Sequence, residues 1–223
     1  FVGGSAISAP IIGEDFNWTG GDGTYQVLDD GGSNWRIKFL SSGTFTPLKD
    51  MVIDAFLVGG GGASAGNYCG YGGAGYTTTV RSVVVAANTA YPIVVGAAGT
   101  QTYTVQSDGG TSSAFSAVAN GGHHSVSGDK TWKKTGANGG SGGGGRYADG
   151  GTDGSDGTTG DTAGGKGQGT TTREFGEANG DLYASGGGDN LTATVPNSGN
   201  GGAYKIAPAD GIVVIRQHKE VAA

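Results

Sequence analysis

Two glycine-rich stretches resemble motifs that bind nucleotide phosphates, but neither has the flanking elements that such motifs need. Residues 160–167 read Gly-Asp-Thr-Ala-Gly-Gly-Lys-Gly, so Gly167 stands where a P-loop has the Ser or Thr that binds Mg²⁺. Residues 70–75 fit Gly-x-Gly-x-x-Gly, but a Thr-rich strand follows where a dinucleotide site needs a helix. With 50 Gly in 223 residues, such matches are expected by chance. We therefore expect no cofactor.

The acidic and histidine residues lack the spacing of metal sites. Four aspartates in the second half of the chain could suggest calcium: Asp149, Asp153, Asp156 and Asp161. Their spacing fits neither an EF-hand loop nor a calcium β-roll, so solvated turn residues are the preferred interpretation. His123 and His124 are adjacent and should point to opposite sides of an extended chain, while His218 is distant in sequence. We expect no metal; iron or zinc shared across a trimer axis is the alternative.

No local motif supports catalysis. A Ser/His/Asp arrangement is absent in motif form, and Cys69 lies in a Gly-Tyr loop without a nearby His or cation to activate its thiol. Glu174 and Glu177 flank Phe175 and could form the acid/base pair of a glycoside hydrolase. Three residues apart in a loop, they are more typical of surface charges. We expect no enzymatic activity, and a glycan depolymerase is the least favoured alternative.

Aromatic side chains on a glycine-rich scaffold are better candidates for binding. Trp132 lies between Lys130 and Lys133, in the most basic stretch of the chain. Five more aromatic residues are predicted to contact a receptor: Tyr68, Tyr71, Tyr147, Phe175 and Tyr183. An aromatic ring beside charged and amide groups suits a sugar or a protein loop, and it loses little conformational freedom on binding. For Trp132, contact with a receptor and packing on the glycine-rich region remain equal alternatives; for the other aromatic residues, packing is the favoured alternative.

Charge and composition exclude several classes of protein. The formal net charge of −6 argues against a nucleic-acid partner and against anionic lipid, since both need concentrated Lys and Arg. No stretch approaches the roughly 20 apolar residues of a membrane span, and residues 1–10 lack the features of a signal peptide. The start at Phe1 favours a C-terminal piece or a processed product. A single Cys excludes an internal disulfide, which fits folding in a bacterial cytosol.

The apolar pattern predicts an all-β fold. Short β-branched and aromatic runs are separated by Gly, Asn and Asp, at residues 35–40, 51–58, 76–85, 91–95, 102–106, 112–118 and 212–216. Trp35, Ile37 and Phe39 alternate with Arg36 and Lys38, which is typical of a strand with one buried face. Residues 51–58 are apolar except for Asp54, which indicates a buried central strand. Hairpin-like spacing favours a β-sandwich or jelly roll.

Composition divides the chain into three regions. Residues 1–32 are expected to link the domain to a shaft, and residues 33–119 with 203–217 to form the sandwich core. Residues 120–202 form a glycine-rich insertion with exposed loops. Because few bulky aliphatic residues occur in this insertion, the last core strand must return from its far side.

Glycine recurs every third residue in two parts of the insertion. The two runs are Gly136, Gly139, Gly142 and Gly145, then Gly151, Gly154, Gly157 and Gly160. Three residues per turn is the repeat of an extended left-handed helix, and glycine lets such helices approach at backbone contact. Their N–H and C=O groups would then pair between neighbours. We predict a bundle of polyglycine-II helices; a disordered glycine-rich loop is the alternative.

The order of these blocks resembles a known family. Residues 56–62, 72–76, 91–99, 108–115, 119–122 and 210–216 follow one another as in the glycine-rich C-terminal domains of phage and prophage tail fibres and receptor-binding proteins. The resemblance covers roughly residues 35–216. The ectodomain of anaplastic lymphoma kinase-type receptors is similar, and this resemblance implies a tumour-necrosis-factor-like sandwich that carries packed polyglycine helices. That relative is rich in Cys, whereas this chain has one, which favours the phage family.

The resemblance implies a role in host attachment. We expect a tail-fibre tip that recognises a bacterial surface polysaccharide or outer protein, is joined to the rest of the fibre, and forms a homotrimer in the virion. Binding would be weak at one site and raised by avidity. No binding residue carries over by motif, because the family's loops vary. The alternative is a structural virion or extracellular filament subunit without a receptor.

Overall fold

The part of the chain that the structure describes forms ten short β-strands and one 3-10 turn. The computed structural model describes residues 9–31, 34–65, 69–102, 105–126, 135–158 and 163–218. Within them the elements are β1 (Phe16–Trp18), β2 (Tyr25–Gly31), β3 (Asn34–Phe39), β4 (Gly43–Pro47), β5 (Met51–Val58), β6 (Thr77–Val85), β7 (Tyr91–Ile93), β8 (Ser112–Ala114), β9 (Ala117–Ala119), η1 (Glu174–Gly176) and β10 (Ile212–Gln217). The predicted all-β class is confirmed.

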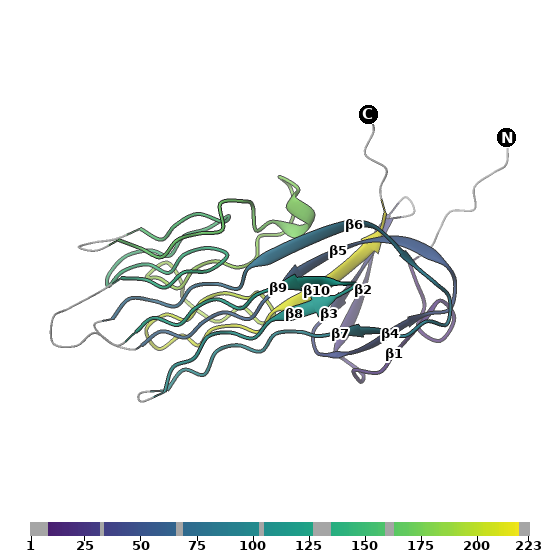
Figure 1. Cartoon of the computed structure of the whole chain (residues 1–223), viewed down its shortest axis with the longest axis horizontal. Coiled ribbons are helices and arrows are strands. Elements are labelled where there is room, and N and C mark those ends of the chain that lie inside the picture. Colours follow the sequence, from purple (N-terminus) through teal and green to yellow (C-terminus); the bar gives the residue numbers. More distant parts are fainter. Residues whose placement is uncertain are drawn as a thin grey trace.

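The strands pair into antiparallel sheets that pack as a sandwich at one end of the molecule (Figure 1). One sheet has the order β2-β3-β10-β5-β6, a second has β1-β4-β7, and β8 pairs with β9 in a small hairpin. Between the two larger sheets lies an aromatic core, in which the rings of Phe39 and Phe45 are 5.7 Å apart. Trp35, Ile37 and Phe39 face this core, as the alternation in β3 predicted.

Two strands of the five-stranded sheet are buried on both faces. In β5, Ile53 and Leu57 face the sandwich core, while Phe56 and Val58 face a second apolar cluster on the outer face. β10 lies between β3 and β5 and alternates in the same way. Burial on both faces explains the continuous apolar run of β5 and confirms its prediction as a buried strand.

Residues 9–31 belong to the sandwich, whereas composition predicted a linker over 1–32. β1 pairs with β4 and β2 pairs with β3, and the Phe16 ring is fully buried. Composition did not predict these strands, because β1 has only three residues and β2 is an edge strand that exposes polar side chains.

Two predicted strands differ in detail. Of the predicted strand 102–106, residues 103 and 104 lie outside the described residues, and Gln106 pairs with Gln101 in an isolated bridge. Residues 112–118 form the hairpin β8–β9, because Phe115 and Ser116 have φ values of 50° and 62° and turn the chain. A positive φ is uncommon for residues with a side chain, so composition does not reveal such turns.

Extended segments outside the strands run from the sandwich to the far end of the molecule and back (Figure 1). We call them the glycine lattice: residues 59–65, 69–76, 96–102, 105–111, 120–126, 135–158, 163–168, 184–188 and 199–211. The lattice therefore begins well before the predicted insertion at residue 120. It includes the glycines that adjoin the core strands before residue 120 as well as the glycines of the predicted insertion.

Hydrogen bonds in the lattice repeat every three residues. Successive N–H groups of one segment point to different neighbours: Gly60 donates to Gly110, Gly61 to Ala209 and Gly62 to Gly73. Three residues further on, Ala63 donates to Ser107, on the same neighbour as Gly60. This is the predicted arrangement of packed polyglycine-II helices, which have three residues per turn.

The segment 71–76 lies at the centre of the lattice. Its N–H groups bond in antiparallel register to three segments. Tyr71 and Ala74 donate to Gly144 and Ser141 of the first segment, and Gly72 and Gly75 donate to Gly202 and Gly199 of the second. Gly73 and Tyr76 donate to His123 and Asn120 of the third. Its carbonyl groups accept from three more sets of neighbours: Gly62 and Gly59, Ala137 and Gly140, and Gly187. Surrounded in this way, the segment has its backbone groups paired without a conventional sheet.

A reversal of the chain divides each of the two period-three glycine runs; the last residue of the second run, Gly160, lies outside the described residues. Ala137 and Gly140 donate to Tyr71 and Ala74 in parallel register, whereas Ser141 and the residues after it pair antiparallel to the same segment. The second run reverses at Asp153 and Gly154, which have φ values of 53° and 78°. One run therefore supplies two short neighbouring segments instead of one longer helix.

A methyl group at a central lattice position should destabilise the fold. A Cβ at Gly73 would lie 1.9 Å from the backbone oxygen of Asn138, a contact that only backbone movement can relieve. We expect Gly73→Ala to lower the free energy of unfolding by about 3 kcal/mol, at the upper end of the range for overpacked interiors.

Gly169→Ala is the matched control. Gly169 has no heavy atom within 4 Å of its built Cβ and a φ of 75°, so the cost there is backbone strain of about 1 kcal/mol. Denaturant unfolding of both variants measures the difference. Equal losses of unfolding free energy in Gly73→Ala and Gly169→Ala would contradict direct backbone contact in the lattice.

Candidate functional site

A loop from the glycine-rich half covers the outer face of the five-stranded sheet. Residues 172–184, the covering loop, include η1 and bury Phe175 and Tyr183 against Phe56. The ring centroids of Phe175 and Tyr183 lie 6.0 and 5.5 Å from that of Phe56. Packing was favoured over receptor contact for both side chains, and at 2% and 7% exposure their rings pack in the interior.

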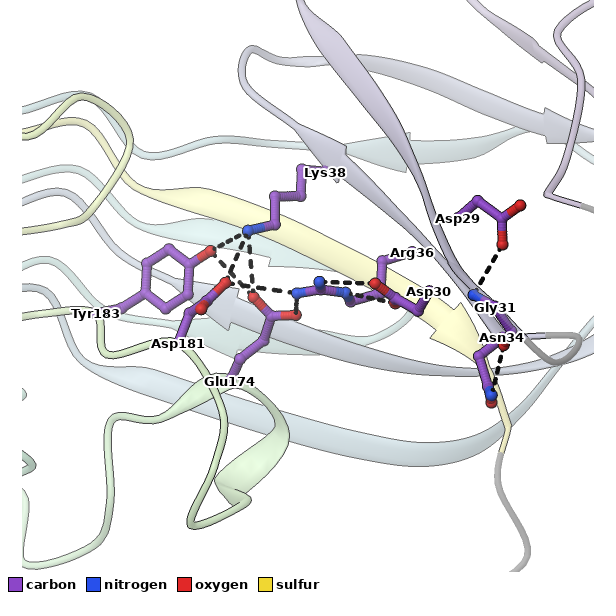
Figure 2. Close-up of polar contacts among 9 residues, drawn as sticks. All are labelled: Asp29, Asp30, Gly31, Asn34, Arg36, Lys38, Glu174, Asp181 and Tyr183. Atoms are coloured by element: carbon purple, nitrogen blue, oxygen red, sulfur yellow. Dashed lines mark hydrogen bonds and ion pairs between the residues drawn. The ribbon is translucent and has the colours of Figure 1, made fainter.

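Charged groups attach this loop to β3 (Figure 2). Arg36 Nη1 donates to Glu174 Oε1 at 2.7 Å, and Arg36 Nε donates to Asp30 Oδ2 at 2.8 Å. Lys38 Nζ donates to the Tyr183 hydroxyl at 2.9 Å, and that hydroxyl donates to Glu174 Oε2 at 3.1 Å. Burial and the Glu174 carboxylate raise the pKa of Tyr183 to about 12. The network joins the two halves of the molecule.

A second charged network surrounds Asp54, the polar residue of β5. Arg216 Nε, Arg81 Nη1 and His218 Nδ1 lie 3.1, 3.3 and 2.6 Å from its carboxylate oxygens. Burial alone would raise the pKa of Asp54, but hydrogen bonds from His218, the Ser82 N–H and Arg216 lower it below the ordinary value. Arg216 also bonds Glu177 at 2.7 Å and packs 4.0 Å from the centre of the Phe175 ring.

Glu174 and Glu177 both line a cleft of about 210 Å³, together with Asp30 and Asp181. Glu174 is buried, so its interpretation as a surface charge was wrong: the covering loop carries it onto β3, a contact remote in sequence. Each of the two carboxylates is paired with an arginine. Such pairs hold the loop to the sheet and do not resemble the acid/base pair of a glycoside hydrolase, which needs a protonated carboxyl.

An aromatic cleft lies at the end of the lattice away from the sandwich. Segment 71–76 runs directly into β6, so Tyr71 and its partners Gly144 and Gly202 lie at the opposite, distal end. There the turns at residues 145–148 and 203–206 enclose a space of about 230 Å³. We call it the distal cleft; the side chains that matter below are Tyr71, Arg146, Tyr147, Asp189 and Tyr204.

The floor and rim of the distal cleft differ in exposure. Tyr71 is 5% exposed and its hydroxyl donates to Asp189 Oδ1 at 2.5 Å. Burial and the Asp189 carboxylate raise the pKa of Tyr71, so its hydroxyl stays a donor. Tyr147 and Tyr204 are 67% and 42% exposed and form the rim. The cleft therefore offers aromatic surface beside a fixed carboxylate.

Turns with positive φ present the rim residues. Tyr147 has a φ of 59°, and the Arg146 guanidinium lies 4.3 Å from its ring centre. Lys205, with a φ of 63°, places its ammonium 5.0 Å from the Tyr204 ring. Left-handed backbone at residues with side chains costs about 1–3 kcal/mol and concentrates at ligand-binding positions.

The structure brings together Tyr71 and Tyr147 of the predicted binding residues. Trp132, Lys130, Lys133 and Tyr68 lie outside the described residues. Tyr204 and Asp189 also line the cleft and were not among the predicted binding residues. Tyr204 had a visible signal: like Arg146-Tyr147, the pair Tyr204-Lys205 places an aromatic ring beside a cation just after a glycine run. Asp189 had none, because its partner Tyr71 is remote in sequence.

His123 and His124 converge where opposite directions were expected. Their Nδ1 atoms lie 3.1 and 2.6 Å from the two oxygens of Asp108, since the lattice backbone lacks the flat alternation of a strand. Across the described part of the chain, no three His, Cys, Asp or Glu side chains are grouped as a metal site. The same residues contain no helix with the length and apolarity of a membrane span.

Comparison with known proteins identifies the glycine-rich part. A family model described as a glycine-rich domain matches residues 40–216, from the end of β3 through the lattice to β10. No curated protein matches the chain. The matched span contains both the lattice and the distal cleft.

Acid should weaken the fold through Asp54. Its folded-state pKa lies below the ordinary 3.8 of the unfolded chain, so its contribution is present above that value and is lost as pH falls through it. We expect the free energy of unfolding to be flat near neutral pH and to fall below about pH 4, with a shallower fall in Asp54→Asn. Denaturant unfolding across this range measures the slope, and identical slopes would exclude Asp54 as a contributor.

Removing the buried charge of the covering loop should be costly. Glu174→Gln removes the buried anion of Arg36 and Lys38 and leaves them only the more exposed carboxylates of Asp30 and Asp181. Because breaking a buried pair costs about 3 kcal/mol or more, we expect a clear loss of stability. Lys49→Met is the control, because Lys49 pairs with Asp15 while 69% exposed, and we expect no measurable change there. Thermal unfolding compares the two variants. Similar melting temperatures would mean that the network does not hold the loop.

Proposed function

The chain belongs to the family of glycine-rich domains, and we propose that it is the receptor-binding module of a bacteriophage tail fibre. Its distal cleft contacts a polysaccharide or protein on the bacterial surface. The observation that carries the proposal is a pair of exposed tyrosines at the distal end of a rigid lattice. Exposed aromatic residues that are held in place are the usual anchors of binding surfaces.

The arrangement of the two halves supports this role. Figure 1 shows an elongated molecule with the sandwich at one end and the lattice segments extending to the other. The partners of Tyr71 place the distal cleft at the end of the lattice away from the sandwich. A surface at the far end of a rigid body reaches a target without obstruction by the sandwich. Because lattice segments are hydrogen-bonded on several sides, the turns that carry Tyr147 and Tyr204 are positioned before binding, and pre-organisation reduces the entropy lost on contact.

The chemistry of the cleft suits a sugar. A tyrosine ring packs against the apolar face of a pyranose, and the Asp189 carboxylate, Arg146 and the tyrosine hydroxyls offer acceptors and donors for hydroxyl groups. Such a site binds weakly when single. We propose that the module acts as a homotrimer joined to the rest of the fibre in the virion, so that avidity raises the affinity. Sedimentation equilibrium tests the trimer, and a monomer at micromolar concentration would contradict it.

Binding should depend on the rim of the distal cleft. We expect the fluorescently labelled chain to bind some strains of a bacterial panel, or their extracted glycans, saturably. Tyr147→Ala should weaken binding about 10-fold, since loss of an aromatic anchor costs 1–2 kcal/mol. Trp132→Ala tests the loop that the sequence analysis singled out.

Ile11→Ala is the control for this experiment. Ile11 is 49% exposed and precedes β1 in the sandwich, so its removal should leave binding unchanged. Equal losses of binding affinity in Tyr147→Ala and Ile11→Ala would mean that the receptor contact lies outside the distal cleft. No binding to any strain, with polymerisation in the same buffer, would favour a structural virion or filament subunit.

A further inference from the structure

Three residues far apart in sequence meet at the sandwich end, outside the distal cleft. Asp54 lies on β5, Ser82 on β6, and His218 directly after β10. His218 Nδ1 is 2.6 Å from Asp54 Oδ1, and His218 Nε2 is 3.1 Å from the Ser82 hydroxyl oxygen. Carboxylate, imidazole and hydroxyl are thus connected in the order that activates a serine nucleophile.

The strand pairing explains how the three groups meet. The register between β5 and β6 shifts between Ile53 and Ala55, and Ser82 takes a φ of 56° at this bulge. The His218 N–H donates to the Val52 carbonyl at 3.0 Å, which extends the pairing of β10 with β5 and fixes the imidazole above Asp54. Bulges of this kind redirect a side chain out of the regular alternation.

The environment of Asp54 sets the protonation pattern of the imidazole. Asp54 is fully buried and accepts from Arg216 and Arg81, which hold it as a carboxylate. A carboxylate only accepts, so the neutral imidazole carries its proton on Nδ1 and leaves the Nε2 lone pair toward Ser82. Ser82 is exposed and can be reached by a reagent from solvent.

We propose that Ser82 is an activated nucleophile that accepts an acyl group from small carboxylic esters. The Ser82 oxygen forms a bond to the carbonyl carbon while its proton passes to His218 Nε2. The bond from that carbon to the alcohol oxygen then breaks, and the alcohol leaves with the proton from His218. Asp54 positions the imidazole and stabilises its cation during the transfer.

The surroundings of Ser82 define the class of ester. Val52 and Val84 face each other across β5 and β6 and are 41% and 73% exposed, which provides a small apolar surface for a short acyl chain. The Ser82 N–H donates to Asp54 Oδ1 at 3.2 Å and so is directed away from an oxyanion. Loss of one hydrogen-bond donor to the oxyanion slows acyl transfer about 10²–10³-fold. We therefore expect reaction only with esters that have good leaving groups, and we expect the acyl-serine to persist.

Acetylation by p-nitrophenyl acetate tests the proposal on the whole chain. We expect peptide mapping by mass spectrometry to find an acetyl group on Ser82, and Ser82→Ala to lose this site. His218→Gln should slow acetylation of Ser82 about 100-fold, the lower range for loss of a general base. Thermal unfolding of each variant verifies that it is folded.

Ser116→Ala is the matched control, because Ser116 is also exposed and has a φ of 62°. Its replacement should leave the acetylation of Ser82 unchanged. Acetyl groups confined to lysines, or a Ser82 rate that His218→Gln leaves unaltered, would overturn the proposal. Receptor binding is measured separately at the distal end, so either result leaves the proposed function intact.

Discussion

Direct contact between backbones, which only residues without a Cβ allow, is the constraint on which the glycine lattice depends. At Gly61 and Gly73 an added Cβ would lie 1.9 Å from a neighbouring carbonyl oxygen. The same closeness lets many N–H groups reach a carbonyl group on another segment, so in the described lattice segments backbone pairing takes the place of a large apolar core. The lattice gains hydrogen bonds and packing but little burial of large apolar side chains, and it needs attachment to a body that has them.

Side chains on the outer face of the five-stranded sheet provide that attachment. The covering loop packs Phe175 and Tyr183 on Phe56 and closes over Glu174, which meets Arg36 and Lys38 (Figure 2). Burial of apolar rings supplies the stabilisation, while the ion pairs satisfy charges that the loop covers. The sheet thus has a sandwich core on one face and an anchor for the lattice on the other.

Local sequence patterns predicted the strands and the glycine lattice. Contacts between residues remote in sequence determine which side chains are buried and which are paired. Alternation placed Trp35 and Ile37 in the core, and the glycine period predicted the lattice, because both depend on near neighbours. The burial of Glu174, the partnership of Tyr71 with Asp189 and the convergence of Asp54 with His218 join positions more than a hundred residues apart. No spacing encodes such pairs. Turns at Tyr147 and Lys205 escaped prediction because their positive φ occurs at residues that seldom adopt it.

Because glycine backbones are identical, the lattice segments could pair in more than one register. A segment shifted by three residues would find the same donors and acceptors, so register is weakly specified by the glycines alone. Side chains at fixed places break this degeneracy: the Gln168 amide, for example, accepts from the Thr77 N–H at the start of β6. Contacts with the sandwich therefore help to set the register of the lattice. Since most lattice hydrogen bonds join remote parts of the chain, we expect the lattice to fold slowly.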